Sequence, residues 1–175
     1  MKLNLGSCDR GFPGFQSVDL CPPADIIADL SQPWPWPDSS VEGVRAHDVF
    51  EHIGDCDHYL TRCGRCAGPG DTTRHWSGRI HCMNELWRVL VPGGRATVEV
   101  PSAAHGAGFA CDPTHVTPWC MASFAYFEDG SLANNRFAQS YGIAARFRVL
   151  SLVETNDPSH PEPVWKVTAI LEAVK

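Results

Sequence analysis

The stretch from residue 41 to residue 100 constrains the fold most, because two β-rich segments in it flank one amphipathic helix. Val41 to His47 predicts a strand, and Arg79 to Leu90 predicts a helix with apolar residues at helical spacing. Pro92-Gly93-Gly94 ends this helix, and Arg95 to Val100 predicts the next strand. Strands joined through a helix pair in parallel, so we expect an α/β fold with a mostly parallel sheet.

Further β-rich segments extend this sheet. They are Leu3-Asn4-Leu5, Phe15 to Leu20, Ile26 to Asp29, Phe147 to Glu154 and Val164 to Val174. The last two are joined by a turn-like stretch, Asp157 to Pro161, which favours an antiparallel hairpin. Strands alternating with helices predict a sheet that is covered on both faces, with the hairpin at its edge.

Three segments between these strands differ from them in composition. Gln32 to Asp38 alternates proline with tryptophan and predicts an extended connector. Asp48 to Ile53 predicts the start of a helix, with Asp48 as its N-cap. From Gly54 to Ser77 the chain is rich in Gly, Cys, Asp and Arg without sustained periodicity. We therefore expect one domain over residues 1–175 with a Cys-rich insertion at about 54–77.

Charge and hydropathy exclude several classes of partner. The formal net charge is −6 and the Arg and Lys residues are scattered, so no basic face for nucleic acid is expected. No segment approaches the roughly 18 apolar residues of a membrane span, and the N-terminus lacks a signal-peptide stretch. These features predict a cytoplasmic protein without a nucleic-acid or membrane partner, and they leave its oligomeric state open.

A cytoplasmic location disfavours disulfides among the eight cysteines, because thiols in the cytosol stay reduced. Cys63-Gly64-Arg65-Cys66 has the spacing that lets two thiolates bind one zinc ion. Residues close enough in sequence to complete the site are Cys56, His58, His75, His81 and Cys82. A second paired motif is missing, so zinc competes with a flexible insertion that carries reduced cysteines.

A nucleotide site is indicated by one glycine and one acid. In a parallel sheet such a ligand binds beyond the carboxyl ends of the strands, where Gly6 ends the first strand and Asp19 the second. A glycine there lets the ligand approach the backbone, and an acid accepts hydrogen bonds from ribose. The alternative is a plain turn at Gly6 and a loop cap at Asp19. No Gly-x-Gly-x-x-Gly is present, which disfavours a nicotinamide-dependent oxidoreductase.

Further segments resemble the class I S-adenosylmethionine (SAM)-dependent methyltransferases, especially the methyltransferase-11-like group. The matching segments, in order, are Leu3 to Cys8, Ser17 to Leu20, Ala28 to Leu30, Trp34 to Val41, Ala46 to Ile53 and Asn84 to Gly94. The resemblance covers most of the chain from Met1 to Pro101 and leaves out the insertion. It implies a Rossmann-like methyltransferase sandwich that uses SAM, releases S-adenosylhomocysteine (SAH) and methylates a small-molecule substrate.

The resemblance also implies which residues bind the cofactor. Gly6, Ser7 and Cys8 would line the methionine moiety, Asp19 and Leu20 the ribose, Asp29 and Leu30 the adenine, and His47 would lie at the end of the fourth strand. The first loop departs from the family pattern, because it carries fewer glycines and only Ser7 to Gln16 separates the first two strands. We therefore expect the first helix to be reduced to a turn.

Candidate catalytic residues lie in the loop after the fifth strand. Asp112-Pro113-Thr114-His115 resembles an Asp-Pro-Thr-His motif of some relatives, and His115 with Asp112 would supply a base if the methyl acceptor carries a proton. Alternatively, Asp112 and His115 hydrogen-bond each other and fix the loop. His52 is a weaker candidate, equally typical of helix packing.

Two wider alternatives stay open at this point. Trp34, Trp36 and Trp119 could flank a sulfonium, although tryptophans are more often core residues. The chain as a whole could be a non-catalytic SAM-binding or assembly protein of the same fold. The leading prediction is an enzyme, a SAM-dependent methyltransferase.

Overall fold

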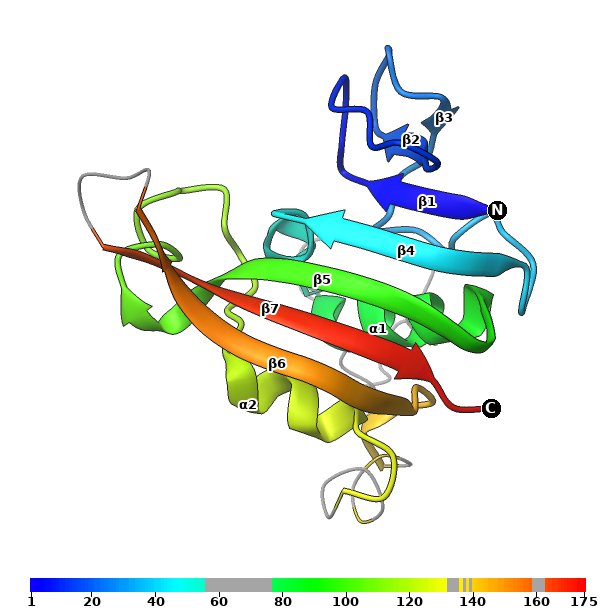
Figure 1. Cartoon of the computed structure of the whole chain (residues 1–175). Helices are drawn as coiled ribbons and strands as arrows, with labels where there is room; N and C mark the ends of the chain where they lie inside the picture. Colours follow the sequence, from blue (N-terminus) through cyan, green and yellow to red (C-terminus); the bar gives the residue numbers. More distant parts are fainter. Residues whose placement is uncertain (56–76, 132–135, 137, 139, 159–162) are drawn as a thin grey trace, which may run out of the picture.

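The chain folds around a mixed β-sheet. The computed structural model describes residues 1–55, 77–131, 136, 138, 140–158 and 163–175. Within these residues, seven strands form one sheet in the order β3-β2-β1-β4-β5-β7-β6 (Figure 1). The strands are β1 (Lys2–Leu5), β2 (Gln16–Asp19), β3 (Ile26–Ile27), β4 (Val41–His47), β5 (Leu90–Gly106), β6 (Phe147–Asp157) and β7 (Val164–Ala173). Strands β1 to β5 pair in parallel, whereas β7 is antiparallel to β5 and β6, which confirms the predicted sheet and hairpin.

One long helix and several single turns accompany the sheet. The helices whose bounds lie within the described residues are η1 (Phe50–His52), α1 (Gly78–Val89), α2 (Met121–Phe124) and η2 (Ala125–Phe127). Helix α1 confirms the amphipathic segment that links β4 to β5, and its buried residues include Met83, Leu86 and Val89. None of the helices in the described part of the chain is long and apolar enough to cross a membrane.

The helix predicted to start at Asp48 is wrong in its extent. Only the single 3₁₀ turn η1 forms, its N-cap is Val49, and Asp48 has a positive φ of 51°. The carbonyl of Glu51 accepts from the amides of Val116 and Thr117, and the hydroxyl of Thr117 donates to the carbonyl of Ile53. Tertiary partners thus occupy carbonyls that a continuing helix would use, and the helix ends.

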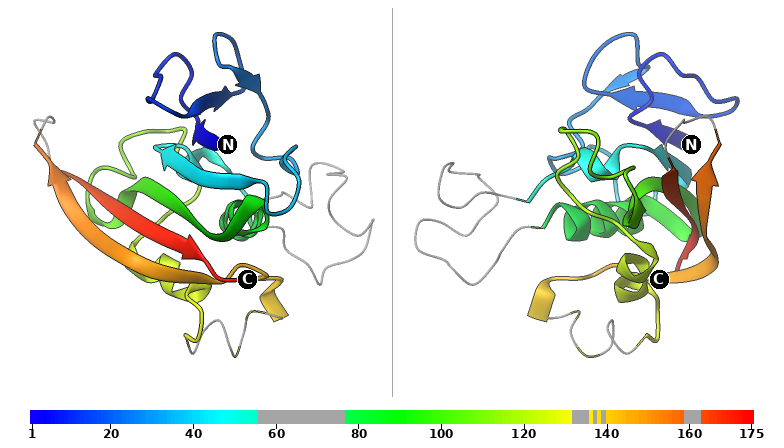
Figure 2. Two further views of the ribbon diagram at one scale, coloured as in Figure 1. Left: turned by 45° about the vertical axis from the view of Figure 1, so that its right-hand side comes forward. Right: turned by 90° about the vertical axis from the view of Figure 1, so that its left-hand side faces the viewer.

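Coverage of the sheet also differs from the prediction. The described helices lie on one side of the sheet, as Figures 1 and 2 show from three directions. Burial follows this arrangement, because alternate residues of β5 and β7 are buried while those between them are only partly covered or exposed. The connections at residues 6–15 and 20–25 are too short for crossover helices. The prediction of helices on both faces is therefore wrong for the described residues.

The loop after β1 replaces a helix on the opposite face. The side-chain amide of Asn4 donates to the carbonyl of Arg10 (3.0 Å), and its oxygen accepts from Arg45 (3.2 Å). The Arg45 guanidinium also lies 4.9 Å from the ring centre of Phe12. The predicted reduction of the first helix to a turn is confirmed, and this loop buries Asn4 against the sheet.

The proline-rich connector is held by α1. Arg88 donates to the carbonyls of Trp34 (3.0 Å) and Trp36 (2.8 Å) and bridges the carboxylates of Glu85 (2.8 Å) and Asp38 (2.7 Å). Both tryptophan side chains are buried in the core, and so is Trp119. The interpretation of the three tryptophans as core residues is thereby confirmed. The connector links β3 to β4.

Candidate functional site

The turn after β1 packs directly against Val49, the second residue after β4. Gly6 has a φ of +62°, and a Cβ atom placed on it would lie 2.6 Å from Cγ2 of Val49. Positive φ is costly for residues with a side chain, and the space is already filled. Glycine is therefore required here, at the carboxyl ends of two neighbouring parallel strands.

Asp19 ties this turn to the end of β2. One carboxylate oxygen accepts from the amide of Cys8 (2.8 Å) and the other from the amide of Leu20 (2.6 Å). The hydroxyl of Ser7 donates to the carbonyl of Asn4 (2.9 Å), and this hydrogen bond stabilises the turn. Five of the residues predicted from the sequence thus form one unit, which we call the β1–β2 turn unit: Gly6, Ser7, Cys8, Asp19 and Leu20.

The predicted adenine residues follow β3 and adjoin this unit. The amide of Ala28 donates to the carbonyl of Asp19 (2.9 Å). The Asp29 carboxylate accepts from the amide of Ser31 (2.9 Å), whereas the Leu30 side chain is buried in the hydrophobic core. Asp29 therefore directly follows the residue that contacts Asp19, and the buried Leu30 side chain anchors the segment.

His47 belongs to a charged cluster at the end of β4. Nε2 of its ring hydrogen-bonds Glu99 on β5, and Arg45 donates to Nδ1 (3.3 Å). Lys166 on β7 lies 3.3 Å from the Glu99 carboxylate and 2.7 Å from that of Asp48. The hydrogen bond from His47, helped by the Lys166 charge, lowers the pKa of Glu99 to about 2. This cluster fixes the His47 ring across two strands.

Glu99→Gln should therefore destabilise the protein in a pH-dependent way. Because the pKa of Glu99 is depressed in the folded state, its stabilisation is complete above about pH 4.5 and is lost as the pH falls towards 2. We expect a loss of about 1–2 kcal/mol at pH 7, after allowance for partial exposure. Urea unfolding of both proteins from pH 7 to pH 3 measures this difference. The exposed Glu42→Gln should change stability by less than about 0.5 kcal/mol. An equal penalty at both ends of the pH range would contradict the assignment.

A second cluster joins η1 to the loop after β5. Nε2 of His115 lies 3.9 Å from Oε1 of Glu51, and Nε2 of His52 lies 4.0 Å from the same oxygen. Glu51 is 0% exposed, and neither of its carboxylate oxygens has a hydrogen-bond partner among the described residues. Burial raises the pKa of Glu51 to about 8. We call Glu51, His52 and His115 the Glu-His-His cluster.

The predicted pair of Asp112 and His115 is brought together, but not by a direct hydrogen bond. Oδ2 of Asp112 lies 3.6 Å from Nε2 of His115, while Oδ1 accepts from the amide (2.8 Å) and hydroxyl (2.6 Å) of Thr114. These bonds from Thr114 lower the pKa of Asp112. His115 is held instead through Nδ1, which donates to the carbonyl of Phe109 (3.0 Å). The loop is thus fixed without using Nε2 of His115.

Sequence reasoning missed Glu51. Its neighbour His52 was considered as a base, but no periodic signal shows that the adjacent carboxylate turns inward. The only available hint was an acid next to a histidine at the end of a strand–turn segment.

The zinc residues predicted in the insertion cannot be placed. Cys56, His58, Cys63, Cys66 and His75 lie outside the described residues. Of the other two candidates, Cys82 is fully buried in the core, and burial raises the pKa of its thiol. Nε2 of His81 lies 3.0 Å from the carbonyl of Leu30.

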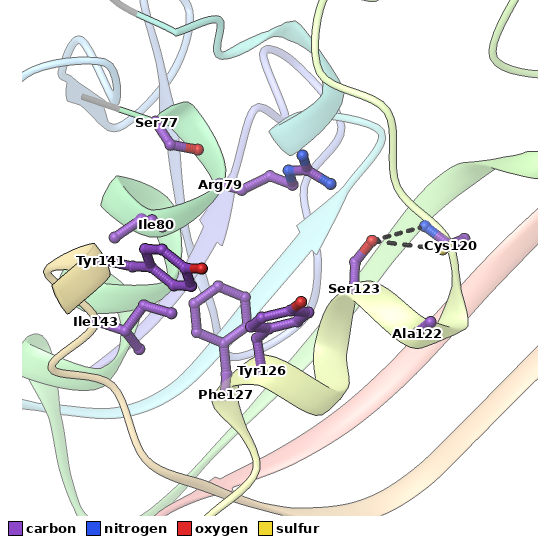
Figure 3. A pocket seen from close by; sticks show the side chains of 10 residues that line it. All are labelled: Ser77, Arg79, Ile80, Cys120, Ala122, Ser123, Tyr126, Phe127, Tyr141 and Ile143. Atoms are coloured by element: carbon purple, nitrogen blue, oxygen red, sulfur yellow. Dashed lines mark hydrogen bonds between the residues drawn. The ribbon is translucent and has the colours of Figure 1, made fainter. Parts of the chain in front are cut away.

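A cavity of about 420 Å³ lies between α1 and the α2–η2 segment (Figure 3). Its lining comprises Ser77, Arg79, Ile80, Cys120, Ala122, Ser123, Tyr126, Phe127, Tyr141 and Ile143. None of these is a residue predicted from the sequence to bind cofactor or to act in catalysis. The cavity is therefore separate from the strand ends where the β1–β2 turn unit lies.

Comparisons with known proteins identify the fold. No protein-family model matches the sequence, and no curated protein matches it significantly. A SAM-dependent methyltransferase from Methanosarcina mazei aligns with 99% of this chain and 92% of its own, with a TM-score of 0.57 and 13% identity. A Burkholderia thailandensis 1,6-didemethyltoxoflavin-N1-methyltransferase, solved with bound 1,6-didemethyltoxoflavin and SAH, aligns with 99% of this chain and 71% of its own, with a TM-score of 0.58 and 12% identity.

A third similar chain comes from the complex between the Haloferax volcanii Trm112 methyltransferase activator and a putative methyltransferase. It covers 99% of this chain and 82% of its own, with a TM-score of 0.56 and 15% identity. The alignments extend over nearly the whole chain, although the sequences have diverged widely. This protein has the fold of the class I SAM-dependent methyltransferases.

Proposed function

We propose that this protein transfers a methyl group from SAM to a small-molecule acceptor and releases SAH. The observation that carries the proposal is the β1–β2 turn unit. It joins a glycine turn to an acid at the carboxyl ends of adjacent parallel strands, where nucleotide ligands bind in such sheets. The shared fold with methyltransferases, one of them solved with SAH, supports the same cofactor.

The β1–β2 turn unit offers hydrogen-bond acceptors and an apolar surface to the cofactor. Each oxygen of the Asp19 carboxylate accepts one backbone hydrogen bond, and each retains a lone pair that can accept from a ribose hydroxyl. Leu20 is 67% exposed beside it and offers an apolar contact. We assign Gly6, Ser7 and Cys8 to the methionine moiety, Asp19 and Leu20 to the ribose, Asp29 and Leu30 to the adenine, and His47 to the end of β4.

The chemistry asks little of the protein beyond positioning. The leaving group of SAM is a sulfonium, so holding acceptor and methyl in line can supply about 7–11 kcal/mol of the barrier. Where the acceptor carries a proton, His115 is the base that we propose. Its Nδ1 donates to Phe109, so Nε2 of the neutral ring keeps a lone pair, and Asp112 stabilises the cation formed on protonation.

Titration calorimetry with SAM and with SAH tests the proposed function. We expect each ligand to bind at one site per chain, because each chain carries one β1–β2 turn unit. A chain that binds neither ligand at millimolar concentration is not a SAM-dependent enzyme. Binding of both by the Asp25→Ala variant checks that the signal does not depend on a carboxylate away from the proposed site.

A further inference from the structure

We propose that the Glu-His-His cluster is a zinc site, formed by Glu51 and His52 of η1 and His115 of the loop after β5. One ligand atom from each residue lies within 4.8 Å of the others, and the two histidine rings are 4.9 Å apart between centres. Glu51 and His52 are adjacent in the chain, whereas His115 lies 63 residues after His52. None of the three belongs to the cysteine-rich insertion or to the β1–β2 turn unit.

Both histidines present the nitrogen that a metal needs. Nδ1 of His115 donates to the carbonyl of Phe109 (3.0 Å), and Nδ1 of His52 lies 3.2 Å from the carbonyl of Thr114. A histidine whose one ring nitrogen donates to a carbonyl keeps a lone pair on the other nitrogen, an arrangement shared by most metal-binding histidines. In both rings that other nitrogen is Nε2, the atom nearest Oε1 of Glu51.

The burial of Glu51 points independently to a role as a cation ligand. Its carboxylate is fully buried, and among the described residues neither oxygen finds a hydrogen-bond donor. A buried carboxylate without partners is strongly unfavourable, whereas a bound cation compensates its charge. The backbone around it is fixed, because the amides of Val116 and Thr117 both donate to the Glu51 carbonyl (2.9 Å each).

Two imidazole nitrogens and one carboxylate oxygen form a ligand set typical of zinc sites with an open position. With bonds of about 2.0–2.2 Å, tetrahedral zinc would bring the ligand atoms to about 3.4 Å from one another. The observed 3.9 and 4.0 Å separations need a contraction of only about half an ångström. The fourth position is open to water or to Oδ2 of Asp112, which lies 3.6 Å from Nε2 of His115.

Zinc and proton acceptance exclude each other at His115, because both use the lone pair of Nε2. His115 therefore serves as the base only in metal-free protein. The zinc site does not rest on SAM binding, and the two are tested by different ligands. Metal binding is measured without SAM, and SAM binding is measured on metal-free protein.

The experiment uses the full chain after chelator treatment, with Cys63→Ser and Cys66→Ser in every variant to remove the paired thiolates of the insertion. Titration with zinc should show one ion per chain. Zinc at a hundred times its Kd should raise the Tm by about 5–10 °C. Cobalt in place of zinc should give the absorption of a nitrogen and oxygen site, without a thiolate-to-metal charge-transfer band. No binding in this background, or a thiolate band, would overturn the proposal.

Glu51→Gln separates a metal site from a structural cluster. Glutamine has nearly the same shape and replaces a carboxyl group that is costly to ionise where it is buried, so the metal-free variant should unfold at the same temperature as its parent or higher. Its zinc affinity should fall by at least about a hundredfold, with loss of the zinc-dependent rise in Tm. The matched control is His105→Gln, at an exposed histidine paired with Glu154 on the hairpin, and it should bind zinc like the parent. Unchanged zinc affinity in Glu51→Gln would refute the site.

Discussion

Gly6→Ala should lower the free energy of unfolding by about 2–5 kcal/mol. The left-handed conformation of this residue costs about 1–2 kcal/mol once a side chain is present. The added methyl group would also lie 2.6–2.7 Å from Cγ2 and Cβ of Val49, and such overpacking costs about 1–3 kcal/mol. Since whole domains are stable by only about 5–15 kcal/mol, equilibrium unfolding in urea will resolve this change easily.

Gly14→Ala is the matched control for this prediction. Gly14 also has a positive φ, of 80°, but nothing lies within 4 Å of the position where its Cβ would be. Its substitution should therefore cost only the conformational part, about 1–2 kcal/mol. If the two variants are equally destabilised, the contact between the β1 turn and Val49 is not tight, and the requirement for glycine at Gly6 is conformational only.

Asp19→Ala should weaken SAM and SAH binding by on the order of a hundredfold or more. The proposed site uses this carboxylate for the ribose hydroxyls, and a hydrogen bond to a charged group contributes about 1.5–3 kcal/mol. The substitution also releases the amides of Cys8 and Leu20 that the carboxylate holds at 2.8 and 2.6 Å. Both effects act in the same direction, and titration calorimetry measures their sum.

The control for Asp19 lies on the connection between β2 and β3. Asp25 accepts from the amide and the hydroxyl of Ser17 (2.9 Å each), so Asp25→Ala also breaks two local hydrogen bonds. It should lower stability and leave SAM affinity within about twofold of the parent. Equal loss of affinity in both variants would mean that Asp19 acts through general stability, and its assignment to the ribose would fail.

The alternation of residues in the strands indicates a sheet with one buried face. The segments Val41 to His47 and Arg95 to Val100 alternate apolar and polar residues, as strands with one covered face do. The prediction of two covered faces came instead from the alternation of strands and helices along the chain. Successive side chains of a strand point to opposite faces of the sheet. The alternation of residues within a strand therefore indicates which faces are covered more directly than the alternation of strands and helices does.

The residues of the β1–β2 turn unit lie together for a local reason. Gly6 and Asp19 end neighbouring strands, and parallel pairing places the ends of such strands side by side whatever the rest of the chain does. The reduction of the first helix to a turn is predicted by the small number of residues between these strands. The sequence therefore suffices to predict that Gly6 and Asp19 lie close together.

The sequence by itself determined the strands along the chain, the amphipathic helix between β4 and β5, and the glycine and acid at the first two strand ends. Only the tertiary structure decided that Glu51 points inward and meets His115. The two residues are far apart in the chain, and η1 is a single turn that is too short for periodicity to show its buried side. The direction of the Glu51 side chain is set by the loop that donates two amides to its carbonyl, and such a contact depends on packing between distant segments.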